Sequence, residues 1–527
     1  MNIFRMVTIC IAAIAAQVLM HQVAFGQDDA AAKDPSSSYG VWEAVEGSEP
    51  RENLQVMRLK IHPQAAPVPA LKYRLIPDPA ERTDGNAAPA YLKAMGFVEQ
   101  TNARIALSKL QRKWLDEAND GQHAEFGAPP DGWREMSPDR LPLDEVKAYL
   151  HLISFQEQLL FDAARRKNYS QDRAMEREPN PIGYLLPEVQ QMRELTRQQI
   201  VRMRYAIAQN RIDDAVEILG QMLAMANHIG QDEFLVSTLV GVAIEGMATS
   251  EGLALSQQAA TPNLYWAIAA CPQPMIDISN AIETERILLE RQFPILNEVD
   301  ETVRSKEFWA DFVARMLPQW NEFASQVNSW NQSNRLPDNL DAFQFATIVA
   351  AQYEPARRFL NEACGMSKEQ LDKYPATQIT FLAVVKYHAI SMDEATTLFY
   401  QPYSDLQKLP GSSVRERWRA DLGWIAKAFD TLMLTAGNQV YKAIAREKQR
   451  LALWQTVEAL RMTAAANSGQ APTSLDEFVV PLPLDPVTNK PFEYSVKGQA
   501  VTITGGRING RRYQLAIEVT KPNKEKN

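Results

Sequence analysis

The chain has 527 residues, of which 46% are hydrophobic and 23% are charged, and its formal net charge at pH 7 is −9. This ordinary globular composition excludes a disordered, a collagen-like or a multi-span membrane protein. The acidic excess also argues against nucleic acid or an anionic lipid surface as a partner. A chain of this length exceeds one compact domain, so we expect two or three units or one extended helical array.

The first 26 residues have the pattern of a signal peptide. Arg5 supplies a positive charge, residues 6–20 form an uncharged apolar run, and Ala24 and Gly26 are the small residues that a signal peptidase recognises. Because the apolar run is short for a membrane span, we favour cleavage over an uncleaved anchor. We therefore expect an exported protein, periplasmic or extracellular, with no integral membrane span after signal cleavage.

The next part of the chain divides by composition. Residues 27–50 are rich in Ala, Asp, Ser and Gly and are expected to form a flexible linker. Residues 51–90 are rich in proline, with a short extended segment at Leu71–Ile76. From about residue 97 to residue 466 the hydrophobic period is helical nearly throughout. We assign residues 51–440 to a helical domain with a Pro-rich N-terminal segment.

A helix hairpin is predicted around Asn210, because apolar residues recur every three or four positions on both sides of it. The pattern from Ala206 to Ala215 is similar to the helix-turn-helix of a tetratricopeptide repeat. Only one such unit is found, so we expect an array of antiparallel helix hairpins that is tetratricopeptide-like in part. The following segment, Phe234–Gln257, is apolar on most sides and should be central. Further helices are predicted at Ile276–Gln292, Glu301–Met316, Asp341–Cys364, Thr377–Ile390, Met392–Tyr403 and Val414–Ala466, the last broken near Gly437.

Residues 441–527 are expected to form a separate, small α+β unit. A long helix is followed by a Pro-rich run at residues 480–491, after which the hydrophobic period becomes two. Asn509-Gly510 is a strong hairpin signal. The unit is therefore predicted to carry a β-meander.

Three segments of the chain carry a resemblance: Ala70–Pro77 with the following Gly85–Tyr91, Ala260–Pro274 with Asn263-Leu264-Tyr265-Trp266, and Ser474–Tyr494 with its Asp485-Pro486 loop. Together they resemble a group of uncharacterised, exported planctomycetal proteins. Because the segments are spread over most of the chain, the resemblance implies full-length membership of that group. It implies no activity.

The C-terminal unit by itself carries a second resemblance. A long helix that leads to a Pro-rich Asp-Pro loop and a short sheet is similar to the globular end of type II secretion pseudopilins. The chain departs from that family because a pseudopilin carries its hydrophobic helix at the processed N-terminus, whereas here the helix is internal. This resemblance implies shape, and assembly into a pilus does not follow from it.

The sequence holds no strong catalytic motif: HExxH, GxSxG, Walker A and CxxC are all absent. Glu245 is the single candidate catalytic residue, because a carboxylate in an apolar helix is costly unless it is paired. A raised pKa would suit an acid or a base. We favour the structural alternatives, which are a salt bridge to Arg202 or Arg204 or a place on an exposed stripe. His228, at a predicted helix C-terminus, is expected to be an imidazolium that the helix dipole stabilises.

Two further groups are candidates for binding. Tyr265 and Trp266 can line a ligand groove or a partner interface, or they can pack at a helix start. Asp476, Glu477 and Asp485 offer oxygen ligands for Ca²⁺, but Pro-rich turns also favour Asp for its local backbone hydrogen bonds. We expect neither a metal nor another cofactor.

Cys271 and Cys364 are the two cysteines that follow the signal peptide. In an oxidising compartment they can form one disulfide, and two unpaired thiols are the alternative. With no histidine nearby, they do not make a zinc site.

These observations lead to three functional hypotheses. The first is a non-enzymatic protein-interaction or envelope-associated helical scaffold that binds another envelope or exported protein. It rests on the helix hairpins and on the absence of catalytic motifs. The second is a hydrolase or another enzyme with an unrecognised site near Glu245. The third is a secretion-system-associated component.

Overall fold

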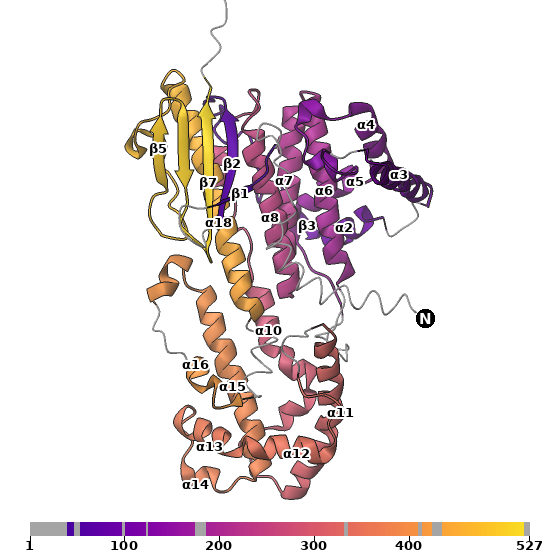
Figure 1. Cartoon of the computed structure of the whole chain (residues 1–527), viewed down its shortest axis with the longest axis vertical. Helices are drawn as coiled ribbons and strands as arrows, with labels where there is room; N and C mark the ends of the chain where they lie inside the picture. The colour runs from indigo at the N-terminus through magenta and orange to yellow at the C-terminus, as the bar shows by residue number, and fades with distance from the viewer. Residues whose placement is uncertain are drawn as a thin grey trace, which may run out of the picture.

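In the computed structural model the chain forms an elongated body, with a sheet-and-helix half and a purely helical half (Figure 1). The structure describes residues 39–46, 53–96, 101–122, 125–173, 186–330, 336–408, 414–423 and 435–520. The predicted signal peptide, residues 1–26, lies outside these ranges. Within them, no helix combines the length and the apolar character that a membrane crossing requires.

The protein is mainly helical, and it has a small C-terminal sheet, as predicted. The helices are α2 (Ala88–Ala94), α3 (Thr101–Asn119), α4 (Leu143–Leu152), α5 (Gln156–Ala164), α6 (Pro187–Ala208), α7 (Ile212–Ile229), α8 (Leu235–Leu255), α9 (Tyr265–Ala269), α10 (Ser279–Gln292), α11 (Lys306–Trp330), α12 (Ala342–Ala351), α13 (Tyr353–Glu362), α14 (Lys368–Leu371), α15 (Ala376–Phe399), α16 (Val414–Arg419) and α18 (Thr435–Ala466). The strands are β1 (Glu43–Glu46), β2 (Asn53–Ile61), β3 (Thr83–Asn86), β4 (Arg166–Asn168), β5 (Glu493–Lys497), β6 (Ala500–Thr504) and β7 (Arg511–Val519).

The main sheet joins the two ends of the chain. Strands β5, β6 and β7 form the predicted antiparallel meander. Strand β2 then pairs with β7 in parallel, and β1 pairs with β2, giving the order β1-β2-β7-β6-β5. The predicted domain limits missed this pairing: β1 lies within the segment predicted as a linker, and β2 within the Pro-rich segment. The residues at 71–76, where an extended segment was expected, form no strand.

Strand β2 belongs to the sheet because its apolar residues alternate. Met57, Leu59 and Ile61 are buried, and the intervening Arg58 and Lys60 are exposed. Met57 lies opposite Leu515 of β7, so the buried faces of the two parallel strands coincide. The period-two signal was thus present in the sequence, but its partner strand is at the other end of the chain.

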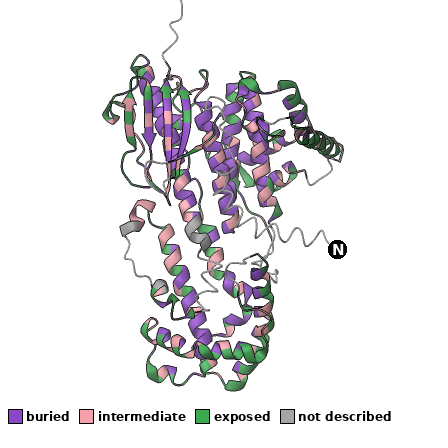
Figure 2. Cartoon of the chain, viewed as in Figure 1, coloured by how far each residue is buried: buried purple, intermediate pink, exposed green. Residues whose placement is uncertain are grey.

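Helix α18 packs against the sheet and against α8, and α7 and α6 follow beside α8 (Figure 1). These four helices and the sheet form the main hydrophobic core, which is largely buried (Figure 2). Helix α8 is buried on nearly all sides, as predicted. It approaches α18 closely at Gly252, where a Cβ atom would lie 2.4 Å from the Trp454 ring. A side chain at this position would therefore force the two helices apart.

The hairpin of α6 and α7 turns at Asn210, as predicted. Asn210 has a φ of 56°, a conformation that asparagine tolerates better than most residues. The N–H of Arg211 donates to the carbonyl of Ala206 at 2.9 Å, which closes the end of α6. A tetratricopeptide-like arrangement of further hairpins is not confirmed.

The helical half, from α11 to α16, has a core of its own that is rich in aromatic residues such as Trp309, Phe312 and Phe381. Its helices differ from the predicted ones. Helix α11 continues through Pro318 to Trp330, because Trp320 and Phe323 beyond the proline are anchored in this core. The two helices predicted between residues 377 and 403 are one helix, α15, and the helix predicted at 341–364 is divided at Gln352 into α12 and α13. Gly437 lies in the first turn of α18, and residues 424–434 lie outside the described ranges, so the predicted break near Gly437 stays a prediction.

Candidate functional site: an apolar groove beside the Pro-rich loop

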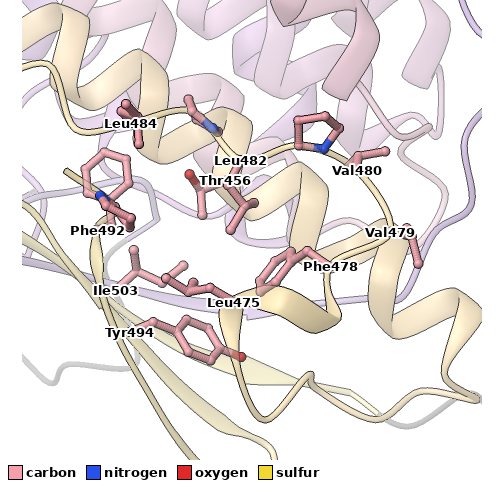
Figure 3. A pocket seen from close by; sticks show the side chains of 13 residues that line it. Thr456, Leu475, Phe478, Val479, Val480, Leu482, Leu484, Phe492, Tyr494 and Ile503 are labelled. Carbon is pink, nitrogen blue, oxygen red and sulfur yellow. The ribbon is translucent and has the colours of Figure 1, made fainter. Parts of the chain in front are cut away.

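A groove with a volume of about 410 Å³ lies between α18, the inner face of the sheet and the Pro-rich loop, residues 478–491 (Figure 3). Its lining residues are Thr456, Leu475, Phe478, Val479, Val480, Pro481, Leu482, Pro483, Leu484, Pro491, Phe492, Tyr494 and Ile503. None of them carries a charge. We call this feature the apolar groove.

Asp485 holds the Pro-rich loop in place. Its buried carboxylate accepts hydrogen bonds from Gln449 Nε2 of α18 at 2.9 Å, from the N–H of Val487 at 2.9 Å and from the N–H of Gly506 at 2.6 Å. These bonds connect the loop to α18 and to the turn that follows β6. Asp485 therefore has the backbone-bonding role that its Pro-rich surroundings favoured.

The proposed calcium ligands are not brought together. Both Asp485 oxygens are occupied by protein donors, and Glu477 accepts from the N–H of Thr473 at 2.6 Å. Asp476 lies in the same short turn as Glu477. Among the residues that the structure describes, no group of three or more His, Cys, Asp and Glu side chains is arranged to hold a metal ion.

The walls of the groove are fixed, but part of their apolar surface is open to solvent. Tyr494 donates its hydroxyl to the carbonyl of Pro472 at 2.6 Å, and its ring packs edge-on against Phe478. The N–H of Val479 donates to Thr463 Oγ1 of α18 at 3.2 Å. Even so, 51% of Val479 and 48% of Leu484 are exposed. Large apolar side chains that remain exposed beside a preformed hollow are typical of binding sites.

Tyr265 and Trp266 lie at the back of the loop. Tyr265 is buried against Ala459 and Met462 of α18, and its hydroxyl donates to the carbonyl of Pro481 at 2.5 Å. Trp266 packs edge-on against Tyr265 and is 37% exposed. Neither residue lines the groove. Tyr265 therefore packs at a helix start, one of the two predicted alternatives, and its hydroxyl also supports a groove-lining proline.

A buried ion pair positions the segment that carries Tyr265. Glu458 and Arg461, one turn apart on α18, are both completely buried and lie 2.9 Å apart. Glu458 accepts from the N–H of Leu264 at 3.0 Å, and Arg461 donates to the carbonyl of Thr261 at 2.8 Å. The charged groups thus satisfy backbone groups of the loop before α9, which offsets the cost of burying them.

Strand β5 is an edge strand of the main sheet, and it adjoins the groove. In the described part of the chain, only β6 pairs with it. Phe492, just before β5, and Tyr494 within it line the groove, whereas Glu493, Ser495 and Lys497 are exposed. The groove therefore lies next to a row of backbone groups that no other described strand engages.

Glu245, the candidate catalytic residue, has partners other than those predicted. Arg204 pairs with Glu251 at 2.6 Å, and Arg202 lies 3.5 Å from Glu157, so the predicted salt bridges to Glu245 are wrong. The predicted alternative of an exposed stripe is also wrong, because Glu245 is 3% exposed. Glu245 is buried because α18, whose position the sequence did not indicate, packs over this part of α8.

The surroundings of Glu245 favour its protonated form. Burial and the nearby carboxylate of Glu447 raise its pKa to about 8, against a smaller opposing effect of Arg450. Arg450 is engaged elsewhere, with both oxygens of Glu447 at 2.8 and 2.9 Å and with the carbonyl of Gly246. Glu245 Oε1 has no hydrogen-bond partner within the described chain, and Glu245 does not line the apolar groove.

His228 is neutral, which corrects the predicted imidazolium. It is buried, and its Nε2 lies 2.9 Å from the carbonyl oxygen of Arg166, which can only accept. Nε2 therefore carries the proton, and Nδ1 accepts from the Tyr91 hydroxyl at 2.9 Å. Burial lowers the pKa of His228 to about 4, so the helix-dipole effect does not determine its charge.

The two cysteines are free thiols, so the disulfide that the sequence left open is not formed. Cys271 is buried in the main core, whereas Cys364 packs against the core of the helical half. Burial raises the pKa of the Cys271 thiol to about 12.

No protein-family model, no curated protein and no solved structure matches the chain.

Proposed function

We propose that this protein is a non-enzymatic binding protein whose apolar groove holds an extended, apolar segment of a partner protein. The observation that carries the proposal is the groove itself, which combines an uncharged lining with the exposed side chains of Val479 and Leu484. Its volume of about 410 Å³ lies in the range of about 300–1,000 Å³ that is usual for binding pockets.

Strand β5 supports an extended conformation for the bound segment. A partner strand that pairs with its open edge would gain main-chain hydrogen bonds, and every second side chain would point toward the groove. Main-chain pairing provides affinity, and the apolar pocket provides selectivity for the side chains. The exposed Glu493 and Lys497 at the two ends of β5 can influence the register of the incoming strand.

The lining also favours binding over catalysis. Acid, base and nucleophilic catalysis needs titratable groups that converge on one place, whereas the groove lining has a single titratable side chain, Tyr494, whose hydroxyl donates to the carbonyl of Pro472. Glu245, on which the enzyme hypothesis rests, is buried and does not line the groove. We therefore prefer the binding hypothesis.

Export and membership of the planctomycetal group belong to the same proposal. The signal pattern of residues 1–26 supports export, and the protein would then act as a scaffold in the envelope or outside the cell. Two of the three segments behind the resemblance meet at the back of the Pro-rich loop, where the Tyr265 hydroxyl donates to the carbonyl of Pro481. The secretion-system alternative has only the shape of the C-terminal unit in its favour.

A peptide selection tests the proposal. We would select a displayed library of random linear peptides on the chain lacking residues 1–26 and measure affinities by fluorescence polarisation. We expect apolar peptides, at least about tenfold weaker binding in Val479→Asp and Leu484→Asp, and no change in Phe343→Asp. Phe343 is a matched control because it is 81% exposed and lies on α12, away from the groove.

A second readout addresses the strand pairing. N-methylation at alternate peptide positions removes main-chain donors and should abolish binding in one register and spare it in the other. Selected peptides that bind Val479→Asp and Leu484→Asp as tightly as the unchanged chain would refute the groove as the site.

A further inference from the structure

A second cavity lies away from the apolar groove, where α4, α5, α6 and α7 meet. Its volume is about 740 Å³, and, unlike the apolar groove, its lining contains charges of both signs. We call it the polar cavity. None of its lining residues belongs to the Pro-rich loop or to the main sheet.

Arg202 is the most deeply placed charge in the polar cavity. Only 10% of its side chain is exposed. One Nη group donates to Gln199 and the other to the carbonyl of Ile153 at 3.3 Å, while Nε has no hydrogen-bond partner within the described chain. A buried guanidinium with an unused N–H is a ready donor to an incoming carboxylate.

The carboxylate that lies nearest to this N–H holds it weakly. Glu157 Oε1 is 3.5 Å from Arg202 Nε, and 59% of the Glu157 side chain is exposed to solvent. An ion pair with so exposed a carboxylate at this distance contributes little to stability, and the Glu157 side chain can turn toward solvent. A ligand carboxylate that approaches to hydrogen-bond distance would therefore replace a long contact with a short one.

Charged residues of both signs, Lys147 among them, complete the lining. Asp144 and Glu217 line the cavity with no ion-pair partner within hydrogen-bond reach in the described chain, whereas Asp214 is paired with Arg211 at 2.6 Å. The cavity therefore offers Arg202 and Lys147 to an anionic group and Asp144 and Glu217 to a cationic group. A ligand that carries both a carboxylate and an ammonium group matches both kinds of charge.

The lining also holds apolar and aromatic side chains, which lie among uncharged polar ones. Among the lining residues, Phe161 and Tyr205 are half-buried, and Leu150 and Ile218 are buried. These side chains offer a surface for an aliphatic group between the two charged ends of a ligand.

We propose that the polar cavity binds a small zwitterion, an amino acid or a short peptide with apolar side chains. The α-carboxylate binds Arg202 and displaces Glu157, and the ammonium group lies among the acidic residues. The polar cavity shares no lining residue with the apolar groove, so the experiment on one site does not test the other.

Calorimetric titration with a matched set of probes tests the proposal. The probes are leucine, leucyl-leucine, N-acetyl-leucyl-leucine, which lacks the ammonium group, and leucyl-leucinamide, which lacks the carboxylate. We expect leucine or leucyl-leucine to bind and both blocked dipeptides to bind at least about tenfold more weakly. Tighter binding of leucine would indicate a free amino acid as the ligand, and tighter binding of leucyl-leucine would indicate a peptide.

Variants of the chain assign the contact. Arg202→Gln should weaken binding at least about tenfold, and Arg197→Gln, on the same helix but outside the cavity, should leave it unchanged. Because Arg202→Gln can disturb packing, Glu157→Gln provides a test at an exposed position: removal of the competing carboxylate should tighten binding. Equal binding of leucyl-leucinamide and leucyl-leucine, no binding of any probe at 10 mM (roughly the limit for a weak site), or tight binding to Arg202→Gln would overturn the proposal.

Discussion

Glu245→Gln should stabilise the protein at alkaline pH and leave its stability unchanged near pH 4.5. The carboxyl group of Glu245 is buried between α8 and α18, with the Glu447 carboxylate nearby and with Oε1 lacking a hydrogen-bond partner in the described chain. Glutamine has nearly the same shape as the protonated side chain, but it cannot ionise.

The magnitude follows from the raised pKa. In the folded protein the pKa of Glu245 is about 8, and its ordinary value is 4.5. Between these two values the folded state keeps a proton that the unfolded state has released, so the free energy of unfolding falls as the pH rises. At about 1.36 kcal/mol for each pH unit, the loss is about 5 kcal/mol once the pH exceeds 8. The glutamine variant does not suffer this loss.

Urea unfolding of both proteins at pH 4.5, 6, 7, 8 and 9 measures the effect. The difference in the free energy of unfolding should be near zero at pH 4.5, rise steadily to about pH 8 and then level off. Glu290→Gln, at an exposed position on α10, is the matched control and should differ from the unchanged chain by no more than about 0.5 kcal/mol at every pH. A difference that does not depend on pH, or a Glu245→Gln variant that is less stable at pH 9, would refute the reasoning.

Three further predictions follow from the packing. Asn210→Val should lower the free energy of unfolding by about 1–3 kcal/mol, because a β-branched residue is strained at a φ of 56°, and Asn210→Gly should be nearly neutral in the same urea assay. Gly252→Ala should destabilise the protein by about 1–3 kcal/mol and alter the near-ultraviolet circular dichroism of Trp454, because the new Cβ atom meets that ring. In the chain lacking residues 1–26, a thiol reagent should titrate two thiols after unfolding without reductant. In the folded protein the half-buried Cys364 should react much faster than the buried Cys271. One reactive thiol or none after unfolding would contradict the free cysteines.

The local elements of this fold could be predicted from the sequence. The helical periods of α7 and α8, the turn at Asn210 and the meander with its Asn509-Gly510 turn depend on residues that are close together in the chain. Asn509 and Gly510 indeed have φ values of 50° and 77°, as a hairpin turn with two left-handed residues requires. Such signals need no knowledge of distant contacts.

The candidate site could be predicted only in part. The Pro-rich loop and Tyr265 stood out in the sequence, but the groove exists because Asp485 bonds to Gln449 and because Tyr265 reaches Pro481. Arg202 was singled out only as a partner for Glu245. Its place in a cavity depends on how α4 and α5 pack beside it.

Tertiary structure alone decided the rest, because charge and pairing depend on what a residue meets after folding. Strand β2 had a period of two in the sequence, but only the folded chain places it beside β7. Burial made His228 neutral and favoured the protonated form of Glu245. The folding of the chain placed Cys271 and Cys364 in different cores. The sequence by itself determined the local helical and strand periods and the turns between neighbouring elements. Long-range packing determined which strands pair and which side chains are buried away from water.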